Sequence, residues 1–134
     1  MRSSDNGKTW SKPKDITGQV LIKQDGTFLG VAPGVGVTTH KGRIVMPLYV
    51  DRKETVSIYS IDNGETWHRM AAHPYAQNID EWQMVQAPSG AVIALGRAKR
   101  YGKTPMSISY DDGKTWIKAG KTNLYAPKCQ KSII

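Results

Sequence analysis

One eight-residue pattern occurs three times in the chain and constrains its fold more than any other feature. The pattern reads S-x-D-x-G-x-T-W and covers residues 3–10, 60–67 and 109–116. Its spacing of about 50 residues lies in the range of solenoid and propeller repeats. Five fixed positions that recur three times within 134 residues are not a chance event, so we expect a chain built from repeated units of one kind.

The residues of this pattern are those of a tight turn. Asp accepts hydrogen bonds from nearby backbone N–H groups, Gly adopts a positive φ, and Trp supplies a large apolar anchor. We therefore interpret the repeats as structural and not as catalytic or metal-binding sites, and we expect each tryptophan to be substantially buried. The structural set comprises Asp5, Gly7, Trp10, Asp62, Gly64, Trp67, Asp111, Gly113 and Trp116.

Between the repeats, short runs rich in β-branched residues alternate with turns that contain Gly or Pro, which is typical of strands. A turn is expected around Gly102, and a turn or two of helix only near 24–29, because no stretch of ten residues has a clear helical period. Strands are expected at 35–40, 43–50, 55–60, 81–87, 91–98, 106–110 and 129–134.

Three or four strands for each repeat of about 50 residues describe the blade of a β-propeller, an all-β fold. A single blade cannot bury both of its faces, so blades must stack. The chain would supply about two and a half blades, with antiparallel four-stranded sheets and the repeat turns as their connections. Residues 1–134 are then expected to be an internal fragment of a single propeller domain.

The composition is strongly basic, with 19 Lys and Arg residues against 11 Asp and Glu and a formal net charge of +8. The lysines are scattered and stand mostly in turns, which argues against nucleic-acid binding. The charge favours attraction of an anionic substrate, with a solvated basic surface as the alternative. Cys129 is the single cysteine; it excludes an internal disulfide and is expected in the core. No apolar run is long enough to span a membrane.

The segments between the turns resemble the bacterial-type exo-α-sialidases, or neuraminidases, of the Asp-box (BNR-repeat) propeller family. Residues 28–36 and 42–49 are similar to the F-L-G-x-G-P-G-x-G and G-R-I-V-x-P-x-Y segments of that family. Residues 81–85 are similar to E-S-Q-x-V, 95–97 to F-M-R and 126–132 to P-Y-C-Q-x-S. The resemblance covers essentially the whole chain, in order, and implies part of a six-bladed propeller.

Four residues depart from these family segments. Ala32 replaces a Gly, Trp82 a Ser, Gly96 a Met and Lys128 a Tyr. Trp82 follows Glu81 directly and should point to the opposite face of the strand. We therefore expect Trp82 to pack between blades without disturbing a site on the other face. Gly96 and Lys128 leave the sub-specificity open.

The resemblance assigns functional roles to two charged residues. Sialic acid carries a carboxylate on its anomeric carbon, which a planar guanidinium binds through two hydrogen bonds. Arg97 matches one of three family arginines that bind this carboxylate. Sialidases use a Tyr nucleophile, whose phenol needs a base because its pKa is about 10, and Glu81 matches the family Glu in that catalytic role. The alternatives are an ordinary surface cation and a solvated acidic residue.

Weaker candidates follow from strand geometry. Gln83 lies two residues beyond Glu81 and therefore on the same face, and Tyr49 ends the strand of the preceding blade that corresponds to the strand of Arg97. Both are candidate substrate-binding residues, whereas Asp80 is expected to face solvent. The charged groups of Glu81 and Arg97 are expected within roughly 10 Å of each other, at the opposite end of the blade from the repeat turns.

No metal and no cofactor are expected. His40, His68 and His73 lack the spacing of metal ligands and are expected in turns and at the surface.

The leading hypothesis is a fragment of an exo-α-sialidase that releases terminal sialic acid with retention. By resemblance, the acid/base Asp and one arginine lie upstream, and the third arginine and the Tyr nucleophile lie downstream, so the 134 residues alone should be inactive. The implied partners are sialylated glycans, glycoproteins or glycolipids and the remaining blades. The implied location is secreted or cell-surface, although no signal peptide is visible.

Two alternatives remain open. Asp-box turns also occur in propellers without activity, so the chain can be part of a propeller that only binds glycans, or of a structural propeller in a sorting or assembly protein. Glu81 close to Arg97 favours the enzyme, because a binding protein has no use for a Glu that assists a Tyr.

Overall fold

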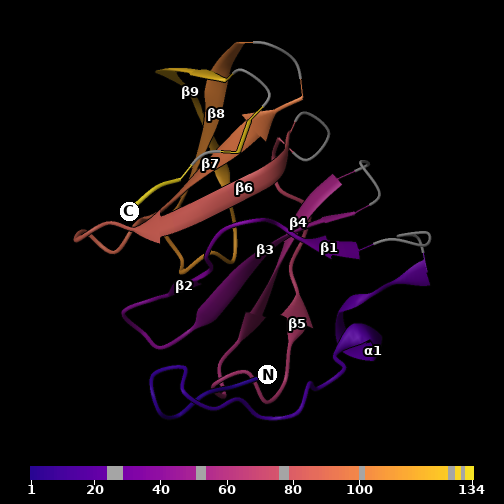
Figure 1. The fold of residues 1–134 in the computed structure, drawn as a ribbon. Coiled ribbons are helices and arrows are strands. Elements are labelled where there is room, and N and C mark those ends of the chain that lie inside the picture. Colours follow the sequence, from indigo (N-terminus) through magenta and orange to yellow (C-terminus); the bar gives the residue numbers. More distant parts are fainter. Residues whose placement is uncertain (24–28, 51–53, 76–78, 100–101, 127–128, 131) are drawn as a thin grey trace.

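The computed structural model describes residues 1–23, 29–50, 54–75, 79–99, 102–126, 129–130 and 132–134. Within these residues the fold is all-β, with two antiparallel sheets and one helical turn, α1 (Thr17–Val20). Figure 1 shows the two sheets side by side, with β6 of the second sheet next to β3 of the first. The all-β prediction is confirmed. The helix expected near 24–29 lies outside the described residues except for Leu29, which begins a strand.

The first sheet is built around β3, which pairs with three other strands. Its order is β1-β3-β4-β5, and β2 also pairs with β3. Leu29 lies opposite Val50 and Thr38 opposite Ile44, so β1 and β2 share the same edge of β3. The strands are β1 (Leu29–Val31), β2 (Val37–Thr38), β3 (Ile44–Val50), β4 (Glu54–Ser60) and β5 (His68–Arg69).

The second sheet is a meander in the order β6-β7-β8-β9. Because each strand pairs with the next one along the chain, short turns connect them. Gly102, around which a turn is expected, begins β8, and residues 100 and 101 of that expected turn lie outside the described residues. The strands are β6 (Ile79–Gln86), β7 (Val92–Ala98), β8 (Gly102–Ser109) and β9 (Ile117–Ala126).

The C-terminal part differs from the prediction in two ways. The sequence does not predict β9, because its residues are mostly polar and do not alternate; its ladder with β8 makes it a strand. A strand is also expected at 129–134, but residues 129–130 and 132–134 form none. A strand needs a partner, and no strand of the described chain pairs with these residues. Cys129 is exposed, so its expected place in the core is wrong.

The three repeat turns share one hydrogen-bond pattern. In each turn, the Ser Oγ donates to the Asp carboxylate, the Gly N–H donates to the Ser Oγ, and the Thr N–H donates to the Asp carboxylate. In the first turn, Asn6 and Gly7 both have a positive φ, of 58° and 84°. Gly adopts such a backbone conformation without steric cost. Hydrogen bonds from Thr9, and then from Ser3, lower the pKa of Asp5 to about 2, because they stabilise the charged carboxylate.

The tryptophans of the repeats are less buried than expected. Trp67 and Trp116 are half-buried, and Trp10 is 61% exposed. The indole N–H groups of Trp10 and Trp67 donate to the Gly carbonyl of their own turns, at 3.1 Å in both cases. The expectation of substantial burial is wrong for Trp10, because its turn satisfies the N–H locally and neither core cluster of the described chain includes its ring.

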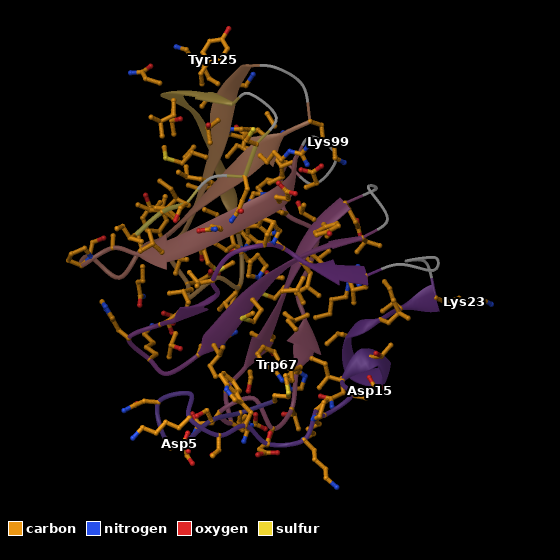
Figure 2. All side chains as sticks on the ribbon, viewed as in Figure 1. Asp5, Asp15, Lys23, Trp67, Lys99 and Tyr125 are labelled. Atoms are coloured by element: carbon orange, nitrogen blue, oxygen red, sulfur yellow. The ribbon has the colours of Figure 1, made fainter. Side chains whose placement is uncertain are left out.

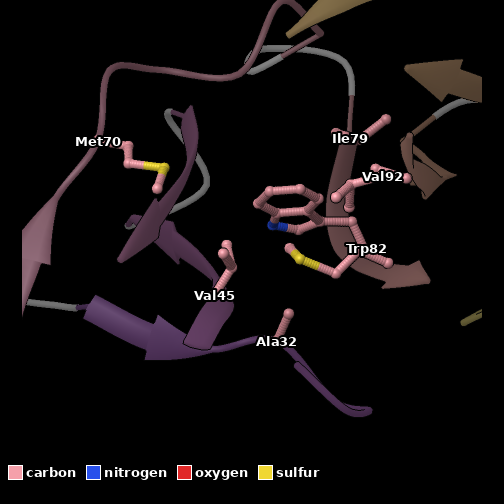
Figure 3. Packing of buried hydrophobic residues seen from close by; sticks show 8 residues of the cluster. Ala32, Val45, Met70, Ile79, Trp82 and Val92 are labelled. Atoms are coloured by element: carbon pink, nitrogen blue, oxygen red, sulfur yellow. The ribbon is translucent and has the colours of Figure 1, made fainter. Parts of the chain in front are cut away.

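The main core lies between the two sheets, with Trp82 near its centre (Figure 3). Trp82 is 1% exposed, and its Nε1–H donates to the Leu48 carbonyl of the first sheet at 3.0 Å. Its ring meets Trp116 edge-on, with centroids 5.7 Å apart. The expectation that Trp82 packs between blades is therefore confirmed. The buried members of this core are Ala32, Val45, Met70, Ile79, Trp82, Met84, Val92 and Ala94.

His73 also belongs to this core. Its ring centroid lies 4.7 Å from that of Trp82 and 5.4 Å from that of Trp116. The expectation of a surface histidine is wrong, because the chain after β5 continues alongside β4, where the His73 N–H donates to the Thr55 carbonyl at 2.8 Å. Burial lowers the pKa of His73 from 6.5 to about 3, since an apolar surrounding disfavours the imidazolium.

The burial of His73 predicts an acid-sensitive free energy of unfolding. Between pH 3 and 6.5 the unfolded chain binds a proton that the native chain does not, so stability is complete above pH 6.5 and falls as the pH is lowered. The slope is at most about 1.4 kcal/mol per pH unit. Urea denaturation across this range measures the free energy of unfolding at each pH. This free energy should depend less steeply on pH for His73→Phe than for the unchanged chain. Changing the exposed His40 to Phe should leave the pH dependence of the unfolding free energy unaltered. Equal pH dependence in all three proteins would contradict the prediction.

Candidate active site

A β-bulge in β6 shapes the candidate site. Ile79 pairs with Ala98 and Trp82 pairs with Gly96, so three steps along β6 match two steps along β7. The extra residue breaks the alternation of side chains. As a result, both Asp80 and Glu81 lie opposite Arg97, the one residue between Gly96 and Ala98.

Three charged side chains meet at this bulge. Arg97 Nη1 lies 3.2 Å from Asp80 Oδ2 and 3.6 Å from Glu81 Oε1. The side chains of Asp80, Glu81 and Arg97 are 20%, 28% and 28% exposed. The predicted approach of Glu81 to Arg97 is confirmed. The expectation that Asp80 faces solvent, made because it matches no family site residue, is wrong, because the bulge turns its side chain toward Arg97.

The departure at Gly96 has a packing reason. A Cβ built on Gly96 would lie 2.6 Å from Ile79 Cδ1, which is far closer than two carbons can approach. Ile79 is buried in the core between the sheets. The Ile79 side chain thus occupies space that any larger residue at position 96 would need, and Gly96 is part of the local packing around the bulge.

The charged cluster lies far from the repeat turns. Ser109, which begins the third turn, pairs with Val92 at one end of β7, whereas Arg97 lies at the other end. Five residues of strand separate the two positions by roughly 16 Å. In Figure 2, Asp5 and Trp67 of the first two turns lie at the lower end of the molecule and Lys99, just beyond Arg97, lies toward the upper end. The predicted separation of turns and site is confirmed.

The two weaker candidates, Gln83 and Tyr49, pack against other parts of the chain. Gln83 is buried; its Nε2 donates to the Pro33 carbonyl at 3.4 Å, and its Oε1 accepts from the Ile133 N–H at 3.4 Å. A Cβ on Gly34 would lie 2.1 Å from Gln83 Nε2, so the loop between β1 and β2 passes directly over this side chain. Tyr49 packs against the core between the sheets. The structure thus brings Glu81 and Arg97 together, and it places Gln83 against the loop between β1 and β2 and Tyr49 against the core.

Sequence reasoning missed Asp80 as a member of this cluster. The signal available was its place beside Glu81, but a bulge cannot be recognised from a single sequence. In the described part of the chain, no group of three or more His, Cys, Asp or Glu residues could hold a metal ion. None of the described helices is both long enough and apolar enough to cross a membrane.

Comparison with known proteins places the chain in a family. It matches the family model described as a BNR repeat-like domain over residues 1–133. A sialidase of Bacteroides fragilis (strain YCH46) is 34% identical over 140 residues, which cover 99% of this chain and 25% of that protein. A sialidase of Paraclostridium sordellii is 36% identical over 125 residues, which cover 85% of this chain and 30% of that protein.

Solved structures agree with these matches. The Hadza microbial sialidase Hz136 has a TM-score of 0.81 and 30% identity, over 96% of this chain and 26% of that one. The intramolecular trans-sialidase from Ruminococcus gnavus, in complex with oseltamivir carboxylate, has a TM-score of 0.76 and 28% identity, over 90% of this chain and 25% of that one. The chain therefore spans about a quarter of the length of such relatives. It belongs to the BNR repeat-like domain family, as part of a propeller of the bacterial sialidase type.

Proposed function

We propose that this chain is part of a retaining exo-α-sialidase that releases terminal sialic acid from glycoconjugates. The observation that carries the proposal is the meeting of Arg97 and Glu81 at the end of the blade away from the repeat turns. The sialidase names of the relatives support the substrate class.

Arg97 would bind the carboxylate of sialic acid. A guanidinium presents parallel N–H donors that match the two oxygens of a carboxylate. The carboxylates of Asp80 and Glu81 hold Arg97 Nη1 at 3.2 and 3.6 Å, so the side chain is oriented before substrate arrives. Such prior ordering lowers the entropy lost on binding.

Glu81 would act as the base that assists a Tyr nucleophile from another part of the enzyme. A carboxylate nucleophile would be repelled by the carboxylate of the substrate, whereas a phenol approaches as a neutral group. The phenol O–H proton would pass to Glu81 Oε1 as the phenol oxygen forms a bond to the anomeric carbon and the glycosidic C–O bond breaks. The departing aglycone oxygen would take a proton from the acid/base Asp of another blade. The resulting glycosyl-enzyme would then be hydrolysed with net retention.

Gln83 and Tyr49 would support the binding of substrate from the surrounding packing. Gln83 fixes the loop at Pro33 and Gly34 against β6, and Tyr49 lies near the end of β3, opposite Gly30 of β1. In this proposal they set the shape of the wall beside Arg97. No cofactor is needed, because the chemistry uses only a phenol, carboxyl groups and water.

Other blades would complete the enzyme. The face of the first sheet away from β6 carries a cavity of about 650 Å³, lined in part by Val31, Met46, Ile58 and Trp67. A neighbouring blade would cover this apolar lining, as stacked blades do. The acid/base Asp, two further arginines and the Tyr nucleophile would come from those blades. Sialylated glycans on glycoproteins and glycolipids are then the substrates, and a secreted or cell-surface location would give access to them.

The test is a Glu81→Gln variant of the complete enzyme. Loss of the base should lower kcat by roughly 10²- to 10⁴-fold and change KM little, because Gln keeps the size of the side chain but cannot take the proton. Release of a fluorophore from a fluorogenic sialoside measures both constants.

The matched control is Glu65→Gln. Glu65 also pairs with cations, Arg2 and Lys14, but it lies in the second repeat turn, so this change should leave both constants within about twofold. Unchanged kcat in Glu81→Gln would contradict the role of Glu81. An unaltered protein that binds sialosides but never cleaves them would favour the glycan-binding propeller.

A further inference from the structure

Asp80 contacts both members of the candidate site with its two oxygens. Oδ2 lies 3.2 Å from Arg97 Nη1, and Oδ1 accepts the backbone N–H of Glu81 at 2.8 Å. The side chain is 20% exposed. One carboxylate thus contacts the guanidinium and also the bulged backbone that carries Glu81.

The position of the Asp80 carboxylate is informative, because a second negative charge does not by itself raise the affinity of a site for an anionic sugar. Asp80 repels a bound carboxylate by Coulomb interaction. The repulsion is offset only if the same charge improves how Arg97 presents its donors. Arg97 stands on the strand opposite the bulge, and a long side chain in a half-exposed position has many rotamers to choose from.

We propose that Asp80 is a positioning residue that orients Arg97 toward the substrate carboxylate and stabilises the bulge that holds Glu81 in place. This inference rests on the proposed sialidase function and deepens it. Asp80 itself does not touch the substrate. Its ion pair fixes the guanidinium, and its hydrogen bond to the Glu81 N–H stabilises the backbone at the point where the ladder is interrupted.

Two variants of the complete enzyme separate these two contacts. Asp80→Asn keeps an oxygen that can accept the Glu81 N–H but removes the charge that faces Arg97. It should raise KM for a sialoside about tenfold, equivalent to about 1.4 kcal/mol, and leave kcat within about threefold. Asp80→Ala removes both contacts, so kcat should fall as well, by roughly tenfold, because Glu81 loses its place.

A second substrate distinguishes orientation of Arg97 from a general structural role. The methyl ester of the same sialoside has no negative charge for Arg97 to bind. If Asp80 acts through Arg97, the tenfold penalty of Asp80→Asn on the acid should shrink to less than twofold on the ester. A general loss of structure would penalise both substrates equally and would lower the midpoint of thermal unfolding.

The matched control is Asp112→Asn. Asp112 also forms an ion pair, 3.1 Å from Lys41 Nζ, and is similarly shielded from solvent, but it lies in the third repeat turn. Its φ of 59° suits Asn, since Asn6 and Asn63 occupy the same place in the other turns with φ of 58° and 56°. This variant should keep the kinetic constants of the unaltered enzyme on both substrates.

The outcomes keep the two proposals apart. Suppose that the unaltered enzyme cleaves sialosides. If Asp80→Asn has an unchanged or lower KM, or if its KM rises by the same factor for the acid and the ester, the role of Asp80 is overturned and the proposed function stands. If the unaltered enzyme neither cleaves sialosides nor binds free sialic acid in calorimetry, the proposed function fails, and the role of Asp80 fails with it.

Discussion

Replacing Arg97 with alanine in the complete enzyme should lower kcat/KM for a sialoside by roughly 30-fold to several thousand-fold. The loss corresponds to about 2–5 kcal/mol, the usual cost of truncating one partner of a hydrogen-bonded charge pair. Two effects add in the same direction: the substrate carboxylate loses its bidentate partner, and Asp80 and Glu81 are left facing each other without the cation between them. KM should rise and kcat should fall, and kinetics with a fluorogenic sialoside measure both.

Two further variants test the reason for this loss. Arg97→Lys keeps the charge but not the planar fork of donors, so it should recover only part of the activity. Arg43→Ala removes a cation that stacks on Tyr59, 4.3 Å from the ring centroid. Arg43 directly precedes β3, at the end of that strand that is far from the charged cluster. It should leave kcat/KM within about twofold. Near-normal activity of Arg97→Ala would refute the assignment of Arg97.

Replacing Trp82 with alanine should lower the free energy of unfolding by about 3–5 kcal/mol, the range for large aromatic residues removed from a core. The ring is 1% exposed, contacts His73 and Trp116, and donates a hydrogen bond to Leu48 of the other sheet. Its removal leaves a cavity between the sheets and takes away the hydrogen bond to the Leu48 carbonyl. Chemical denaturation measures the change.

Trp10→Ala is the matched control for this prediction. The same atoms are removed, but Trp10 is 61% exposed and its indole bonds within its own turn, so the cost should stay below about 1 kcal/mol. Because Trp82 adjoins Glu81, Trp82→Ala should also reduce activity. Equal costs at positions 10 and 82 would show that the sheets do not depend on Trp82 to pack together.

The local features of the chain were open to prediction because their physical cause is local. The repeat turns need only Ser, Asp, Gly and Thr within seven residues, and their hydrogen bonds connect atoms of the same turn. The strands β3, β4 and β7 follow β-branched runs between turn residues. Resemblance then supplied Glu81 and Arg97, whose approach depends only on their places at the two ends of one hairpin.

Features that depend on contacts between distant segments were not open to prediction. The strand β9 exists because β8 lies beside it, and His73 is buried because Trp82 and Trp116 close over it from the second sheet. Cys129 and Trp10 are exposed because no neighbouring element in the described chain covers them. Burial is a property of what packs against a residue, and a single sequence does not state that.

By itself, the sequence determined the all-β repeats and their turns, since turn chemistry and strand alternation act over a few residues. The pair Glu81 and Arg97 came from the family resemblance of the segments that carry them. Only the tertiary structure decided that Asp80 joins this pair. A bulge arises when the ladder between two strands must accommodate an extra residue, here between Ile79 and Trp82. Ile79 packs over Gly96 and Trp82 is anchored on Leu48 of the other sheet, so packing on both sides of the bulge fixes where the extra residue lies.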